Sequence, residues 1–175
     1  RRMIEPLPLP ASDADVDALA QLLVDTVEHG AAVSFLAPLP FSVARDWWRS
    51  TLSRAHPRAV FLVARAADGI VGTVQMHPSW APNQPQRGEI AKLMVHRCAR
   101  RTGLARRLME AIERAAVSQG VHLLTLDTKR GDAAEALYRT LGWTAAGTIP
   151  EFAIDSDGSP HDAVIFYKAI GDSSR

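Results

Sequence analysis

The chain has 175 residues, of which 47% are hydrophobic and 22% charged, the composition of an ordinary globular protein with one domain over residues 1–175. Its formal net charge of +1 at pH 7 gives no reason to expect a nucleic acid or a membrane surface as partner. Its single cysteine, Cys98, excludes an internal disulfide and a cysteine metal cluster. No apolar run approaches the roughly 20 residues of a membrane span, so we expect a cytoplasmic protein.

The first part of the chain predicts a short strand and two helices. Prolines in "MIEPLPLP" argue against a signal peptide and confine a strand there to a sheet edge. In "SDADVDALAQLLVDTVEHG", apolar residues at helical spacing predict a helix that Ser12 or Asp13 caps and Gly30 ends. A second helix is predicted within "PFSVARDWWRSTLSRAHP", with Ser42 as its candidate cap and Pro57 beyond its end.

The rest of the chain predicts strands that alternate with helices. The segment "AVFLVARAADGIVGTVQMH" predicts a hairpin around Asp68-Gly69, and "RGEIAKLMVH" predicts a third strand. A helix follows over residues 103–120, then a buried strand in "VHLLTLDT", a short helix in "DAAEALYRTLGW" and a closing strand in "DAVIFYKAI". This order predicts a mixed α/β domain around one central sheet.

The turn before the helix over residues 103–120 is rich in arginine. A helix N-terminus offers unpaired amides and the positive end of the helix dipole, Gly103 lets a phosphate approach the backbone, and Ala105 adds little bulk. Four arginines surround this point: Arg100, Arg101, Arg106 and Arg107. A solvated helix face is the alternative, but cations are unfavourable at a helix N-terminus unless an anion offsets them. We therefore predict a phosphate-rich ligand at this turn.

Residues 100–105 read R-x-x-G-x-A, which resembles the pyrophosphate-binding motif Q/R-x-x-G-x-G/A of the GNAT N-acetyltransferases. The later "LYRTLGW" resembles the L-Y-x-x-x-G-F/W segment of that family, and residues 58–170 follow its order of elements. Four further segments, "LAQLLVDTVEHGAAVSFLAPL", "EIAKLMV", "LLTLDT" and "AEALY", resemble the tabtoxin-resistance branch of the family, in which an amino-acid toxin that contains a β-lactam is acetylated.

The resemblance implies a single GNAT-type domain, a mixed central sheet with a splayed strand pair flanked by helices, and acetyl-CoA as co-substrate. The splayed strand would offer the backbone of Leu93, Met94 and Val95 to the pantetheine arm, much as an added strand would pair. The turn would hold the pyrophosphate through its predicted cofactor-binding residues, which are Arg100, Arg101, Thr102, Gly103, Leu104, Ala105 and Arg106. No metal is expected, because the histidines lack metal-ligand spacing.

The same resemblance implies three catalytic residues. Glu89 and Asp127 are candidate bases for the attacking amine, and Tyr138 is the candidate acid for the departing CoA thiolate. From the residues alone, Glu89 could equally be a solvated residue at a strand end, and Asp127 a turn or cap residue. Either carboxylate could also bind the substrate ammonium or act through a water instead of accepting the proton directly. Tyr138 could also be an aromatic anchor. The asparagine that many members carry seven residues before the tyrosine is Gly131 here.

The acceptor is predicted to bind near "EHGAAVSFLAPLPF", where Phe35 and Leu36 are apolar enough to line a pocket, although core packing is the alternative. The resemblance implies direct transfer of an acetyl group onto a primary amine of a small molecule, with an amino-acid-like toxin or antibiotic as a candidate. A protein or peptide amine acetyltransferase and a non-catalytic CoA-sensing module remain alternatives, and a homodimer remains open. Nucleic-acid binding is disfavoured because a near-neutral charge supplies no broad basic face.

Overall fold

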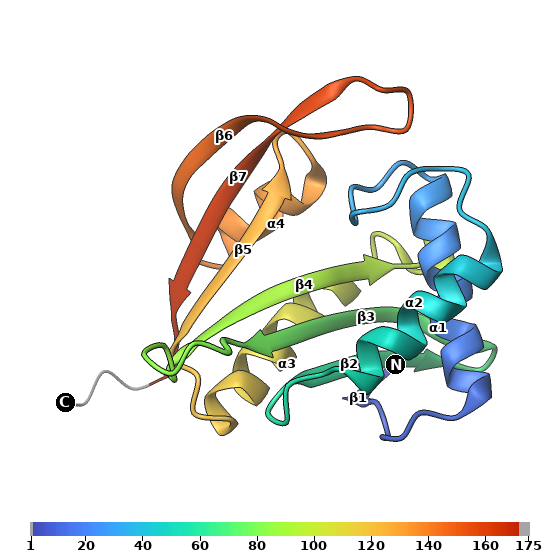
Figure 1. Ribbon diagram of the computed structural model, residues 1–175, viewed down its shortest axis with the longest axis horizontal. Coiled ribbons are helices and arrows are strands. Elements are labelled where there is room, and N and C mark those ends of the chain that lie inside the picture. The colour runs from blue at the N-terminus through green and yellow to red at the C-terminus, as the bar shows by residue number, and fades with distance from the viewer. Residues whose placement is uncertain (1, 172–175) are drawn as a thin grey trace.

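A computed structural model describes residues 2–171 of the chain, which form one mixed seven-stranded sheet in the order β1-β2-β3-β4-β5-β7-β6 (Figure 1). The strands are β1 (Met3–Pro6), β2 (Val60–Ala66), β3 (Gly69–Pro78), β4 (Arg87–Val95), β5 (Leu123–Lys129), β6 (Thr144–Ile154) and β7 (Pro160–Ala169). The helices are α1 (Asp13–Glu28), α2 (Phe41–Ser53), the 3-10 turn η1 (Arg97–Ala99), α3 (Leu104–Ser118) and α4 (Ala133–Thr140). The predicted mixed α/β fold with one central sheet is confirmed.

Helices cover both faces of the sheet (Figure 1). The apolar stripe of α3, which includes Leu104, Leu108 and Ile112, is buried against the strands in one core that also contains Tyr138 of α4. Helices α1 and α2 lie over the opposite face, where Leu19, Leu23 and Trp48 belong to a second core. None of the helices in residues 2–171 is long and apolar enough to cross a membrane.

One predicted helix cap is confirmed, and two other local predictions are corrected. Ser12 caps α1, because its Oγ accepts a hydrogen bond from the amide of Asp15 at 3.1 Å. Helix α2 begins one residue before Ser42, so Pro40 occupies the N-cap position and the predicted Ser42 cap is wrong. The hairpin connection lies one residue earlier than predicted, because Gly69 already pairs with Ala66 across the turn.

Strand β6 is the element that the sequence pattern missed. Within the described part of the chain it pairs with β7 alone, and it lies at the edge of the sheet. Almost all of its eleven residues are exposed, so they show no alternation of buried and exposed side chains, and Pro150 falls within the run. A strand is recognised in a sequence by alternating apolar and polar residues, and this alternation is missing here. A proline within the segment further argues against a strand.

The sheet opens between its two central strands. Parallel strands β4 and β5 pair only at Arg87–Leu123, Gly88–Leu124 and Glu89–Thr125, and they diverge beyond these three positions (Figure 1). The rest of β4, residues 90–95, therefore has no strand partner on its β5 side. The predicted splayed strand pair is confirmed, and the opening positions the site.

A bulge in β4 lies at this opening. The β3–β4 register passes from Gln75–Ala91 to Thr73–Met94, so two residues, Lys92 and Leu93, stand opposite Val74 alone. Lys92 has a φ of 55°, in the left-handed region that non-glycine residues seldom adopt. An extra residue in one strand re-aims the side chains around it, and at this bulge the affected side chains line the opening.

Candidate active site

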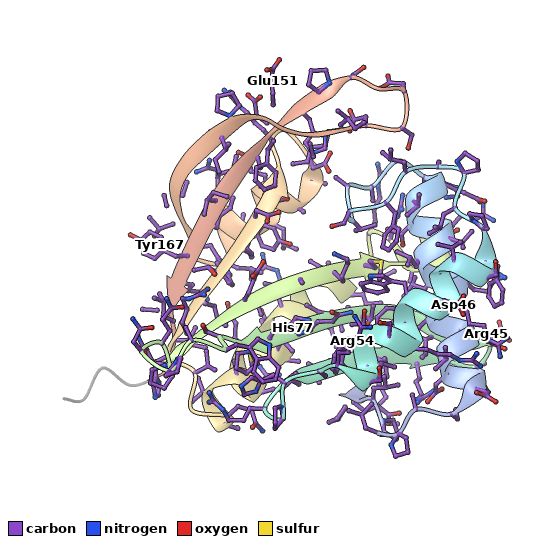
Figure 2. All side chains as sticks on the ribbon, in the orientation of Figure 1. Arg45, Asp46, Arg54, His77, Glu151 and Tyr167 are labelled. Carbon is purple, nitrogen blue, oxygen red and sulfur yellow. The ribbon has the colours of Figure 1, made fainter. Side chains whose placement is uncertain are left out.

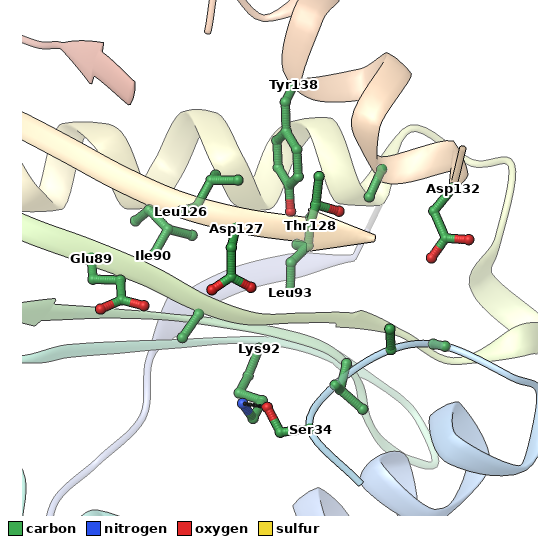
Figure 3. Close-up of a pocket in the computed structure, with 15 residues that line it drawn as sticks. Ser34, Glu89, Ile90, Lys92, Leu93, Leu126, Asp127, Thr128, Asp132 and Tyr138 are labelled. Atoms are coloured by element: carbon green, nitrogen blue, oxygen red, sulfur yellow. Dashed lines mark hydrogen bonds between the residues drawn. The ribbon is translucent and has the colours of Figure 1, made fainter. Parts of the chain in front are cut away.

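A cavity of about 210 Å³ lies where β4 and β5 separate (Figure 3). It is lined by residues of β4, β5, α4 and the loop after α1, including Ser34, Glu89, Lys92, Leu93, Asp127, Thr128, Asp132 and Tyr138. The structure thus brings together all three residues that were predicted as catalytic, Glu89, Asp127 and Tyr138, although they come from three different elements, β4, β5 and α4.

Glu89 and Asp127 face this cavity from neighbouring strands. Glu89 pairs with Thr125 at the last paired position of β4 and β5, and Asp127 stands two residues further along β5, on the same face as Thr125. Partial burial raises the pKa of the Glu89 carboxyl, and the negative charge of Asp127 raises it further. A carboxylate with a raised pKa is the form of carboxyl group that accepts a proton near neutral pH.

Tyr138 is both an aromatic anchor and a group of the cavity. Its ring lies 6.1 Å from that of Trp143 and 5.9 Å from that of Phe166, and only 6% of the residue is exposed. Its hydroxyl nevertheless points down toward the cavity between Leu93 and Thr128 (Figure 3). Burial, and next the negative charge of Asp127, raise the pKa of this phenol, so the hydroxyl keeps its proton at neutral pH.

Lys92 is a residue of the cavity that the sequence analysis did not single out. Its Nζ donates a hydrogen bond to the Ser34 hydroxyl at 3.1 Å and lies 5.6 Å from the centre of the Trp47 ring. Burial lowers the pKa of the ammonium, and the charges of Asp127 and Glu89 partly oppose this effect. The sequence did contain a signal for this residue, namely a lysine within the otherwise apolar strand "EIAKLMV". Charged side chains are seldom buried unless they have a partner.

The turn before α3 forms a cradle of free backbone donors. Gly103 caps the helix with a φ of 77°, and Arg101 also has a positive φ of 60°. The first helical bond runs from the Arg107 amide to the Gly103 carbonyl at 3.1 Å, so within residues 2–171 the amides of residues 101–106 have no backbone acceptor. A Cβ placed on Gly103 would meet no atom within 4 Å, which leaves open space above these donors.

The four arginines predicted around this turn do not all face it. Arg107 donates to the carbonyl of Arg2 at 2.7 Å, so its guanidinium lies against the N-terminal segment, and its predicted place beside the anion is wrong. Arg106 donates to the hydroxyl of Thr140 at 3.1 Å, which holds it between α3 and α4. Arg100 and Arg101 are exposed.

The predicted acceptor residues line a second cavity that adjoins the first through Asp127 and Thr128. This cavity, of about 360 Å³, has Phe35 and Leu36 on one side. On the other side it has residues of β6 and β7 that the sequence analysis missed with strand β6, among them Phe152, Ile154 and His161. Phe35 also packs edge-on against Trp47 at 5.4 Å, so its pocket and core interpretations both hold.

The described residues form no metal site, and one predicted cofactor contact is limited to the backbone. Residues 2–171 contain no group of three His, Cys, Asp or Glu side chains that could hold a metal ion. The side chain of Met94 is buried in the core, with 1% exposed, so its predicted contact with a ligand rests on the backbone alone. Leu93 lines the first cavity.

Comparisons with known proteins find acetyltransferases among the similar chains. The chain is 27% identical over 143 residues to an L-methionine sulfoximine/L-methionine sulfone acetyltransferase of two Pseudomonas strains, P. aeruginosa PAO1 and P. paraeruginosa PA7, and 81% of each chain is covered. A structure assigned provisionally as a phosphinothricin N-acetyltransferase has a TM-score of 0.80 at 16% identity, covering 98% of this chain and 100% of that chain.

A Salmonella typhimurium structure assigned provisionally as an acetyltransferase, solved with its cofactor acetyl-CoA, has a TM-score of 0.78 at 18% identity and covers 100% of this chain and 97% of that chain. At these identities the two structures establish the fold. The model of the acetyltransferase (GNAT) family matches residues 19–143, most of the described chain, and GNAT acetyltransferases use acetyl-CoA. The chain therefore belongs to the GNAT acetyltransferase family.

Proposed function

We propose that this acetyltransferase moves an acetyl group from acetyl-CoA directly onto the primary amine of a small, amino-acid-like molecule. The observation that carries the proposal is the cavity at the β4–β5 opening, where two carboxylates and a protonated phenol converge beside an unpaired strand edge. Direct transfer needs a base for the amine and an acid for the leaving thiolate, and this cavity offers both.

The residues along this edge fit the co-substrate. Acetyl-CoA supplies an activated thioester and a diphosphate. The free amides of residues 101–106, with the dipole of α3, suit the diphosphate, and the exposed guanidinium groups of Arg100 and Arg101 would add charge. We assign the same diphosphate-binding role to Thr102, Gly103, Leu104, Ala105 and Arg106, and assign the pantetheine arm to the backbone of Leu93, Met94 and Val95, which lies where β4 has no partner on its β5 side.

Glu89 is the proposed base. An amine attacks only after it loses its proton, and Glu89 has a raised pKa and lies at the closed end of the β4–β5 opening. Asp127 contributes a second negative charge that keeps the substrate ammonium near Glu89 and raises the proton affinity of Glu89. The two carboxylates would therefore act as a pair, with one group accepting the proton.

Tyr138 is the proposed acid. The departing thiolate needs a proton, and the Tyr138 hydroxyl points into the cavity and stays protonated at neutral pH. The packing of its ring against Trp143 and Phe166 fixes the direction of that hydroxyl. These groups also argue against a CoA-sensing module without catalysis, because such a module has no need of them.

The acceptor is proposed to be small. The apolar side chains of Phe35 and Leu36 line the cavity beside Asp127, whereas a loop that recognised a basic peptide would carry acids. The Pseudomonas relatives are named for L-methionine sulfoximine and L-methionine sulfone, which are both amino-acid analogues. Protection against an amino-acid-like toxin or antibiotic is the corresponding biological role, in the cytoplasm.

A homodimer is proposed on the exposed edge of the sheet. Among the described strands β6 pairs with β7 alone, and the apolar residues Ile149 of β6 and Tyr167 of β7 are exposed. Figure 2 shows that Glu151 lies at the far bend of the same strand and Tyr167 on the outer side of β7. Sedimentation equilibrium would test this part of the proposal, which a monomer at all concentrations would contradict.

The release of CoA thiol from acetyl-CoA against a panel of amines tests the function. The panel contains amino acids and their analogues, β-lactam amino acids, aminoglycosides, polyamines and lysine peptides. We expect release with an amino-acid analogue and little with lysine peptides. A chain that binds acetyl-CoA by calorimetry, yet releases no thiol with any of these amines, would contradict the enzymatic proposal and favour the sensing module.

A further inference from the structure

Two strained residues meet across the active-site cavity. Lys92, at the bulge of β4, has a φ of 55°, and Ser34, in the loop between α1 and α2, has a φ of 74°. Their side chains are joined by a hydrogen bond of 3.1 Å (Figure 3). A non-glycine residue at positive φ is strained, and such residues cluster at ligand-binding sites. The positions of both side chains therefore call for an explanation from function.

Lys92 differs from the other lysines of the chain in having no carboxylate partner. Lys129 contacts Asp155 at 2.9 Å and Lys168 contacts Glu113 at 2.9 Å, whereas within residues 2–171 no carboxylate lies within 4.0 Å of Lys92 Nζ. Glu89 and Asp127 are near enough to influence the charge of Lys92 but do not form ion pairs with it. An ammonium has three N–H donors, and the Ser34 hydroxyl accepts one of them.

The lining of this cavity carries charges of both signs. Glu89 and Asp127 provide negative charge on β4 and β5, and Asp132 adds a carboxylate before α4. Lys92 is the single cation among the described residues that line the cavity; it lies beside Ser34 of the α1–α2 loop, near the Trp47 ring. Because Lys92 donates to the Ser34 oxygen, the hydroxyl proton of Ser34 remains free to be donated in turn. A zwitterion matches this pattern, with its ammonium toward the carboxylates and its carboxylate toward the lysine and serine.

We propose that Lys92 and Ser34 bind the carboxylate of the acceptor, which makes amino acids, rather than amines without an acid group, the substrate class of this enzyme. This inference rests on the proposed acetyl transfer to a small amine and deepens it. A purely structural role is the alternative, in which the Lys92–Ser34 contact only ties the α1–α2 loop to β4. A structural tie would affect every acceptor equally, whereas a carboxylate site distinguishes acceptors by their charge.

The test compares two acceptors that differ only in the carboxylate, L-methionine sulfone and its carboxamide, by steady-state kinetics of thiol release. The wild-type enzyme is expected to prefer the acid by about tenfold or more in kcat/KM, the scale of one charge-assisted hydrogen bond. In Lys92→Met this preference should fall to about one through a higher KM for the acid, and Lys92→Arg should restore part of it. Ser34→Ala should reduce the preference less.

Lys168→Gln is the matched control, because Glu113 already neutralises this lysine at 2.9 Å and the residue lines neither of the two cavities. It should change the kinetics of both acceptors by the same factor and so leave the preference intact. Equal kcat/KM for acid and carboxamide in the wild-type enzyme, or an unchanged preference in Lys92→Met, would overturn the carboxylate site while leaving acetyl transfer in place.

If neither compound releases thiol, calorimetric titration of both into the protein with CoA decides the matter. Binding of the acid that Lys92→Met weakens about tenfold supports the site, and absence of binding overturns it. Failure of the proposed function is a separate result, namely no thiol release with any amine of the wider panel.

Discussion

Asp127 alters the proton affinity of the neighbouring carboxylate, Glu89. The charge of Asp127 raises the pKa of Glu89, second only to the effect of burial. Since a base must be deprotonated to act, kcat/KM should rise with pH through the pKa of Glu89, which lies above its ordinary value. Removing the neighbouring charge should lower that pKa.

Asp127→Asn is therefore expected to move the acidic limb of the kcat/KM profile to lower pH, and Glu89→Gln to abolish this limb together with most of the activity. The measurement is kcat/KM for thiol release between about pH 5 and 9. An acidic limb that keeps its midpoint in Asp127→Asn would show that the titrating base is not next to Asp127. A limb that persists in Glu89→Gln would assign the base elsewhere.

Tyr138→Phe tests the acid. Only the hydroxyl is removed, and the ring that packs against Trp143 and Phe166 is kept, so folding and acetyl-CoA affinity should be retained. Turnover should fall by about 100-fold, the lower range of what a positioned proton donor contributes. Single-turnover kinetics with saturating acetyl-CoA measure this step, and an unchanged rate would leave Tyr138 as an anchor alone.

At the scale of elements, the N-terminus of α3 determines where the cofactor phosphates can sit. Gly103→Glu is expected to lower acetyl-CoA affinity by more than 100-fold, because a side chain and a negative charge would enter the space beside the free amides. Isothermal titration with acetyl-CoA provides the measurement.

The control for this variant is Gly120→Glu, at the other end of the same helix. Gly103 and Gly120 share a φ of 77°, so both substitutions impose the same backbone strain, but Gly120 lies near Arg58. Both variants should lose similar thermal stability, and only Gly103→Glu should lose affinity. Equal losses of affinity would attribute the effect to the stability of α3 rather than to a phosphate site.

At the scale of the whole molecule, one arginine joins three elements. Arg65 of β2 forms ion pairs with Glu5 of β1 and with both oxygens of Asp15 in α1, at 2.8 and 2.9 Å. These hydrogen bonds hold the pKa of the Asp15 carboxyl below its usual range. A lowered pKa in the folded state contributes stability at neutral pH that is lost as the pH falls through that pKa.

Asp15→Asn should therefore lower the free energy of unfolding by about 1–2 kcal/mol at pH 7, and the difference from wild type should shrink as the pH falls below about 4. Urea unfolding at several pH values provides the measurement. Asp13→Asn is the matched control, because Asp13 meets Arg49 at 3.3 Å with 85% of its side chain exposed, and it should change little. A pH-independent loss in Asp15→Asn would contradict the linkage.

The sequence by itself determined those features that depend on neighbours along the chain. Helix α1 begins where it does because the Ser12 side chain accepts a hydrogen bond from the amide three residues later. The cradle before α3 forms because Gly103 occupies the N-cap of the helix that begins at the next residue. The family resemblance identified Glu89, Asp127 and Tyr138 as candidate catalytic residues. Their residue types and positions alone were equally consistent with structural roles, and only the folded chain shows that all three line one cavity.

Tertiary structure alone decided what depends on partners distant in sequence. The separation of β4 from β5 after three pairs, the bulge that aims Lys92 across the cavity, and the pairing of β6 with β7 all arise from strand register. The same holds for Arg107. The sequence predicted this side chain beside the bound anion, but in the folded chain it donates a hydrogen bond to the carbonyl of Arg2. Each of these features depends on contacts between segments that are distant in the sequence, and the local patterns used to predict single helices and strands do not specify such contacts.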